Sequence, residues 1–146
     1  MLPKERPIGL ALLVCDSIIQ DKATNKRTLV GLFDRLVSPR LPFVHPHLSV
    51  YVSITSGRGL YDCEIRCRHQ ETATGVFGIK GQITCESPLQ EVQVVFNLAS
   101  IRFAHAGIHW LEFAVDEVPL MMRRLFIEQS APAQQTPPTA DDPEDV

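Results

Sequence analysis

A two-residue alternation of apolar and polar side chains constrains this chain more than any other feature. Five segments show it: residues 48–55, 61–69, 76–85, 91–98 and 109–115. In the last of these, Leu111, Phe113 and Val115 alternate with Trp110, Glu112 and Ala114. Because successive side chains of a strand point to opposite faces, this period predicts strands with one buried face each.

Three further segments are β-prone with a less regular pattern: residues 9–20, 28–33 and 120–128. Turn signals separate the segments, and Asn25 in the first connection is the residue best able to adopt a positive φ. No segment has a convincing helical period. About eight strands at this spacing predict an all-β fold, an antiparallel β-sandwich.

Two segments are predicted not to be strands. Residues 34–47 contain Pro39, Pro42 and Pro46, which indicates an extended crossover between the second and third strands. Residues 129–146 contain four prolines and no basic residue, which predicts a disordered acidic tail. The expected organisation is a β-sandwich domain over 1–128 followed by a tail over 129–146.

The charge distribution argues against a nucleic-acid partner. Residues 1–128 carry a net charge of +1 and residues 129–146 carry −4. A phosphate backbone is normally bound by a clustered basic face, which a nearly neutral body lacks.

The N-terminal outline imitates a lipoprotein signal, with a basic start, an apolar run and then Cys15. However, Val14 is not the small residue that a signal peptidase prefers, and the apolar run continues through Ile18 and Ile19. No apolar run reaches the ~20 residues that span a bilayer. We therefore expect a strand here, no membrane insertion and a cytoplasmic protein.

The cysteines and histidines offer little catalytic or metal chemistry. Cys63 and Cys67 lie on one strand face with Cα atoms roughly 13 Å apart, too far for a disulfide or a shared metal. Cys15 lies beside Asp16, which raises a thiol pKa, so it is a poor nucleophile. All four cysteines are expected to be reduced, buried side chains, and we predict no catalytic residue and no cofactor.

Several runs resemble an uncharacterised bacterial family, a domain-of-unknown-function group. They are residues 11–16 (ALLVCD), 28–35 (TLVGLFDR), 42–46 (PFVHP) and 94–98 (VVFNL), the last followed by Phe103 and Gly107. The resemblance spans about residues 8–128 and implies an immunoglobulin-like or C2-like β-sandwich, without any activity or site residue. Similar sequences often have a tyrosine near the start of the penultimate strand, where this chain has His109.

Three residues are candidates for a partner surface. Phe43 and Val44 lie between prolines on an extended segment of the kind that recognition surfaces use. Trp110 lies on the strand face opposite Leu111 and Phe113, which predicts an indole in solvent or in an interface unless the tail, a loop or a neighbouring strand covers it.

The leading hypothesis is therefore a non-enzymatic protein-interaction module with an unknown protein partner, and self-association stays open. Two alternatives remain. One is a C2-like ligand- or membrane-binding domain that uses loop aspartates Asp16, Asp21, Asp34 and Asp62. The other is a metal-dependent enzyme with a site built from His45, His47 and cysteines.

Overall fold

The computed structural model describes residues 5–131 and contains nine strands. They are β1 (Ile8–Gln20), β2 (Arg27–Leu32), β3 (Arg35–Ser38), β4 (Phe43–Thr55), β5 (Gly59–His69), β6 (Gly75–Cys85), β7 (Val92–Phe103), β8 (Gly107–Val115) and β9 (Val118–Gln129). Within these residues there is no helix, and so none long and apolar enough to cross a membrane. The predicted tail falls largely on residues 132–146, which lie outside the described part of the chain.

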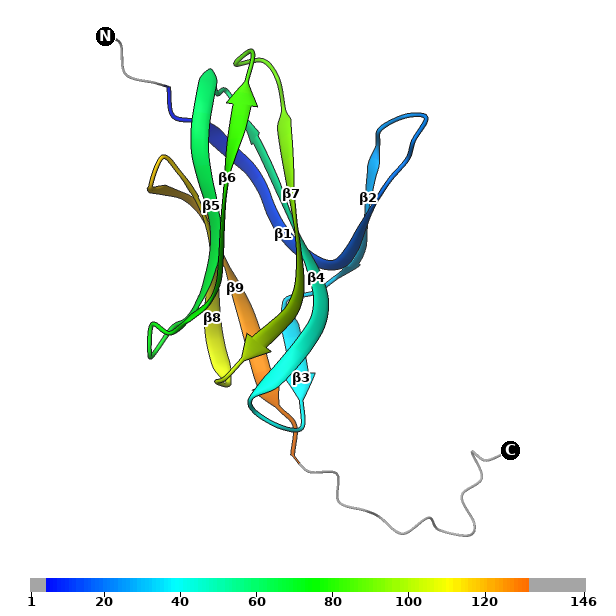
Figure 1. The fold of residues 1–146 in the computed structure, drawn as a ribbon, viewed down its shortest axis with the longest axis vertical. Coiled ribbons are helices and arrows are strands. Elements are labelled where there is room, and N and C mark those ends of the chain that lie inside the picture. Colours follow the sequence, from blue (N-terminus) through cyan, green and yellow to red (C-terminus); the bar gives the residue numbers. More distant parts are fainter. Residues whose placement is uncertain (1–4, 132–146) are drawn as a thin grey trace.

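The strands form two sheets that pack face to face (Figure 1). One sheet has the order β2-β1-β4-β7, and the other has the order β3-β9-β8-β5-β6. All pairs are antiparallel except β3 with β9, which is parallel. The all-β sandwich predicted from the alternation is confirmed, with nine strands in place of about eight.

The apolar positions of the alternation form the core. Val50 and Val52 of β4 belong to the same buried cluster as Ile65 of β5 and Phe113 of β8, and all four side chains are fully buried. Burial of each such side chain contributes about 1.5–3 kcal/mol, so the period-two pattern is the main driving force for this fold.

The prediction that residues 34–47 contain no strand is wrong. Residues 35–38 form β3 beside β9, and β4 already begins at Phe43. Pro46 is tolerated inside β4 because the pairing of β1 with β4 ends at Ser49, so at Pro46 only β7 is a neighbour. A proline without an N–H fits a strand where no partner needs that donor.

After Cys15, β1 leaves β4 and continues as a two-stranded arm with β2 (Figure 1). The turn at its tip contains Asn25 with φ of 59°, as predicted. Arg27 Nη1 donates a 2.5 Å hydrogen bond to Gln93 Oε1 of β7, which ties the arm back to the sandwich.

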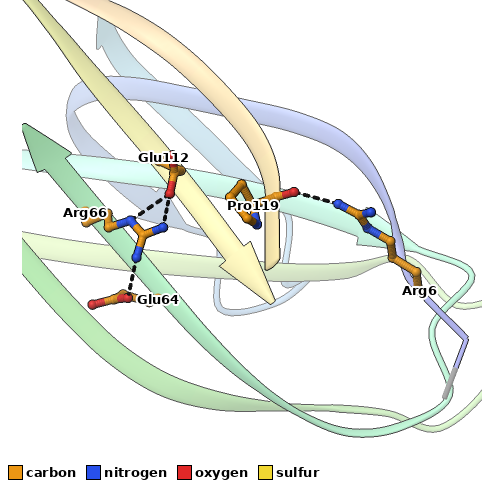
Figure 2. Close-up of polar contacts among 5 residues, drawn as sticks. All are labelled: Arg6, Glu64, Arg66, Glu112 and Pro119. Atoms are coloured by element: carbon orange, nitrogen blue, oxygen red, sulfur yellow. Dashed lines mark hydrogen bonds and ion pairs between the residues drawn. The ribbon is translucent and has the colours of Figure 1, made fainter. Parts of the chain in front are cut away.

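The N-terminal segment closes one end of the sandwich. The buried Tyr61 hydroxyl donates to the Glu5 carbonyl oxygen at 2.6 Å, and Arg6 Nη2 donates to the Pro119 carbonyl oxygen at 2.6 Å (Figure 2). These two bonds tie the first described residues to β5 and to the start of β9.

Candidate functional site

The outer face of the five-stranded sheet, the side turned away from the core, gathers most of the charged and aromatic side chains that could bind a partner. Its central part consists of three cross-strand rows: Arg68–Trp110–Arg124, then Arg66–Glu112–Met122, then Glu64–Ala114–Pro119, each from β5 through β8 to β9. The first row lies near the start of β8 and the third near its end, so the face has two chemically different ends.

We call the surface formed by Arg68, Gln70, Trp110 and Arg124 the Trp110 end. The Trp110 indole N–H donates to Gln70 Oε1 at 2.8 Å, and the Arg124 guanidinium carbon lies 4.9 Å from the centre of the indole ring. The ring is half-buried, so one side remains accessible. A hydrogen bond and a cation–π contact thus hold a large aromatic side chain in a fixed orientation.

The Trp110 end continues onto β9 and β3 with a second arginine–aromatic pair. The Arg35 guanidinium carbon lies 5.3 Å from the centre of the Phe126 ring, and Arg35 Nη1 is 2.6 Å from Glu128 Oε1. No carboxylate of residues 5–131 forms an ion pair with Arg68 or Arg124. This end therefore carries positive charge that the described residues leave largely uncompensated.

The opposite end of the face contains a cleft of about 360 Å³, which we call the acidic cleft. It is lined by Asp62, Cys63, Glu64, Arg66, Lys80, Gly81, Ala114 and Glu117. The hollow exists because Ala114 and Gly81 are small where neighbouring positions carry long side chains, and three carboxylates outnumber two cations around it.

An ion-pair network, drawn in Figure 2, forms part of the wall of the acidic cleft in the rows next to the Trp110 end. Arg66 donates from Nε to Glu112 Oε1 at 2.7 Å, contacts the same oxygen through Nη2, and donates from Nη1 to Glu64 Oε1 at 3.1 Å. The Glu112 side chain is only 8% exposed. Its hydrogen bond, followed by the charges of both carboxylates, raises the pKa of Arg66. The hydrogen-bonding groups of Arg66 thus stabilise the fold and are not free to bind a ligand.

A strained two-residue turn places Glu117 at the rim of the acidic cleft. Asp116 and Glu117 join β8 to β9 with φ of 46° and 68°, and neither is glycine. The Asp62 N–H donates to Asp116 Oδ1 at 2.9 Å, and the Asp116 N–H donates to the Asp62 carbonyl oxygen at 2.8 Å. These bonds to β5 hold the turn in a backbone conformation that non-glycine residues disfavour.

Beneath the Trp110 end the interior contains a cluster of histidines. His69 stacks on His105 with 4.8 Å between ring centres, and His69 and His109 are 5.0 Å apart. The His69 ring nitrogens lie 2.9 Å from Thr72 Oγ1 and from the Ala106 carbonyl oxygen. His109 Nε2 is buried with no hydrogen-bond partner in the described part of the chain, and burial lowers the pKa of His109.

The structure does not bring the three predicted surface residues together. Phe43 stacks on the buried Phe103 with 5.4 Å between ring centres, so it packs against the core. Val44 is 58% exposed and points to the other side of β4, on the four-stranded sheet. Trp110 lies on the outer face of the opposite sheet.

Within residues 5–131 the remaining candidates do not gather into a metal-binding group. Among the described residues no group of three or more histidines, cysteines, aspartates and glutamates could hold a metal ion. His47 Nδ1 lies 2.8 Å from the Asp16 carbonyl oxygen, and Asp21 Oδ1 accepts the N–H groups of Ala23 and Thr24 in its own turn.

The four cysteines are free and buried, as predicted. Burial raises the pKa of the Cys67 thiol to about 12. Burial, followed by the charge of Asp16, raises the pKa of Cys15. Thiols with raised pKa values are protonated near neutral pH and are weak nucleophiles.

Comparisons with known proteins support the resemblance seen in the sequence. A family model described as "Family of unknown function (DUF6941)" matches residues 10–128. No curated protein matches the chain. Two crystal structures of a β-glucosidase from Listeria innocua, one in complex with isofagomine, share 11% identity with it at a TM-score of 0.46. The matched region covers 84% of this chain and 16% of the β-glucosidase chain.

Proposed function

We propose that this chain, which belongs to the family of unknown function DUF6941, is a non-enzymatic protein-interaction module that binds its partner through the Trp110 end. One observation carries the proposal: a half-buried tryptophan on an outer sheet face is held by the hydrogen bond that its indole N–H donates to Gln70 and by the guanidinium of Arg124. Tryptophan and arginine are the residues most enriched among those that dominate binding energies at protein interfaces.

The fixed orientation of Trp110 favours binding because little side-chain entropy remains to be lost on association. Arg68 and Arg124 flank the ring and have no carboxylate partner within residues 5–131. The chemistry of this end therefore suits an acidic protein segment that also offers an apolar group to the indole.

The strand order supports an immunoglobulin-like assignment over a C2-like one. The order β1-β4-β7 facing β9-β8-β5-β6 corresponds to the A-B-E and G-F-C-C′ order of immunoglobulin-like sandwiches. The scattered aspartates, with Asp21 engaged in its own turn, give the C2-like alternative no support. We also propose a cytoplasmic location, because four unpaired buried thiols suit a reducing compartment.

Affinity capture from a lysate of the source organism, quantified by mass spectrometry, tests this function. Trp110→Ala is compared with Tyr51→Ala, a matched control that removes a half-buried aromatic side chain from the outer face of the other sheet. A protein retained by wild type and by Tyr51→Ala but lost with Trp110→Ala supports the proposal. Equal capture by all three folded proteins contradicts it.

A further inference from the structure

We infer that the acidic segment 141–145 of this chain folds back onto the Trp110 end and occupies it until a partner displaces the segment. The inference rests on the proposed function for its biological meaning, since the segment then regulates access to the partner site. The contact itself is a property of this chain alone and can be measured without any partner.

Charge complementarity is the first argument. Asp141, Asp142, Glu144 and Asp145 lie within five residues, and no lysine or arginine follows Arg124. The Trp110 end and its extension carry Arg35, Arg68 and Arg124. Of the nearby carboxylates, Glu128 is already paired with Arg35, and Glu71 lies exposed in the turn beside Gln70. The cations left without an ion pair among residues 5–131 are therefore Arg68 and Arg124, and a run of carboxylates is complementary to them.

The place where the described chain ends is the second argument. β9 ends at the same end of the sandwich at which β8 begins (Figure 1), and the Ser130 N–H donates to the Ser38 carbonyl oxygen at 2.9 Å. From Ser130 back to Arg124 is six residues of strand, about 20 Å. The eleven residues from 130 to 141 reach up to ~36 Å when extended, so segment 141–145 can return to Trp110.

The covalent link raises the local concentration of segment 141–145 at the Trp110 end. A segment tethered by about ten residues has an effective concentration in the millimolar range at the site to which it returns. An intrinsically weak ionic contact is therefore populated within one molecule. A partner that binds in the micromolar range or tighter still displaces the segment.

Trp110 is the sole tryptophan of the chain, so its fluorescence reports the contact directly. The experiment measures acrylamide quenching of full-length protein at about 20 mM and about 500 mM NaCl. The test variant is Asp141→Asn/Asp142→Asn/Glu144→Gln/Asp145→Asn. The matched control is Glu86→Gln/Glu91→Gln, which neutralises two exposed carboxylates in the loop between β6 and β7.

At low salt we expect the quenching constant of the test variant to be about twofold higher than that of wild type and of the control. At high salt the proteins should agree, because salt screens exposed charges. Equal constants at low salt would overturn the inference, as would a difference that persists at high salt or that grows with protein concentration, which indicates binding to a second copy.

The two proposals fail separately. If wild type and the test variant have equal quenching constants but capture of a protein depends on Trp110, the proposed partner surface is supported and binding of segment 141–145 to it is excluded. If quenching differs and no captured protein depends on Trp110, the segment binds but the proposed function is wrong.

Discussion

Two neighbouring rows on the outer face of the five-stranded sheet contain arginines in different surroundings. In the middle row, Arg66 is bonded to the buried Glu112 and to Glu64, so its charge is paired within the fold. One row away, Arg124 lies over the Trp110 ring with no carboxylate partner in residues 5–131. On this reasoning an arginine is a candidate for a partner surface only where its charge is not already paired within the fold.

The layers beneath the two ends also differ. Under the ion-pair network the adjacent inward row contains Ile65 and Phe113, both fully buried. Under the Trp110 end the adjacent inward row contains His69 and His109. The acidic-cleft end thus rests on an apolar core, and the Trp110 end rests on titratable groups.

The largest stability effect should come from breaking the ion-pair network. Glu112→Gln removes the charge that pairs with Arg66 and is expected to lower the free energy of unfolding by about 2 kcal/mol. The loss stays below that of a fully buried pair because the Arg66 side chain is 39% exposed and can be rehydrated. Urea denaturation measures it.

The control for that comparison is Glu64→Gln, whose more exposed side chain should contribute less than about 1 kcal/mol. Equal losses for the two variants would show that burial of Glu112 is not what makes the network structural.

The second prediction concerns the pH dependence of stability and the histidines beneath the Trp110 end. Burial lowers the pKa of His109 from 6.5, so the unfolded chain takes up a proton more readily than the folded protein. Stability is therefore full above pH 6.5 and falls as pH drops below that value, by up to about 1 kcal/mol between pH 7 and 5.5.

His109→Phe should flatten this pH dependence, because it removes the group that the unfolded state protonates. The measurement is urea denaturation from pH 5 to pH 8. An undiminished slope in His109→Phe would show that another group, such as the half-buried His45, is responsible.

The third prediction is a small gain at the acidic cleft. Glu117→Gly relieves a left-handed backbone conformation at φ of 68° and is expected to raise the free energy of unfolding by about 0.5 kcal/mol. Thermal denaturation against wild type measures it. A loss of stability would indicate that the Glu117 side chain makes a stabilising contact in the cleft.

The smallest stability effect is expected at the Trp110 end. Arg124→Gln removes an exposed cation–π contact and should change the free energy of unfolding by no more than about 0.5 kcal/mol, while it weakens partner binding. A loss comparable with that of Glu112→Gln would mean that Arg124 is structural, and the contrast between the two ends would disappear.

The alternation of apolar and polar residues made most strands predictable. The two that were missed or shortened, β3 and the start of β4, lack this signal for local reasons. β3 was missed because its four residues are too few to show a period and its partner, β9, is distant in the sequence. The start of β4 was hidden by Pro46, which is tolerated only because β1 departs at that point.

The composition of the Trp110 end could not be predicted for a geometric reason. A regular hairpin centred on Asp116 and Glu117 places Arg123 opposite Trp110. A register shift between Phe113 and Ala114 places Arg124 there instead. The direction in which Phe43 points could not be predicted for a related reason, since it depends on pairing with Phe103 of β7.

The most direct test of the central claim maps where a partner touches the molecule. A photo-reactive benzoylphenylalanine replaces Ile108, which neighbours Trp110 on the outer face, and in separate proteins replaces Lys80 of the acidic cleft or Val44 of the other sheet. After irradiation in cells of the source organism, the cross-linked products are identified by mass spectrometry. The account predicts a specific product from position 108 and none from positions 80 and 44. A product confined to position 80 or 44 would contradict it.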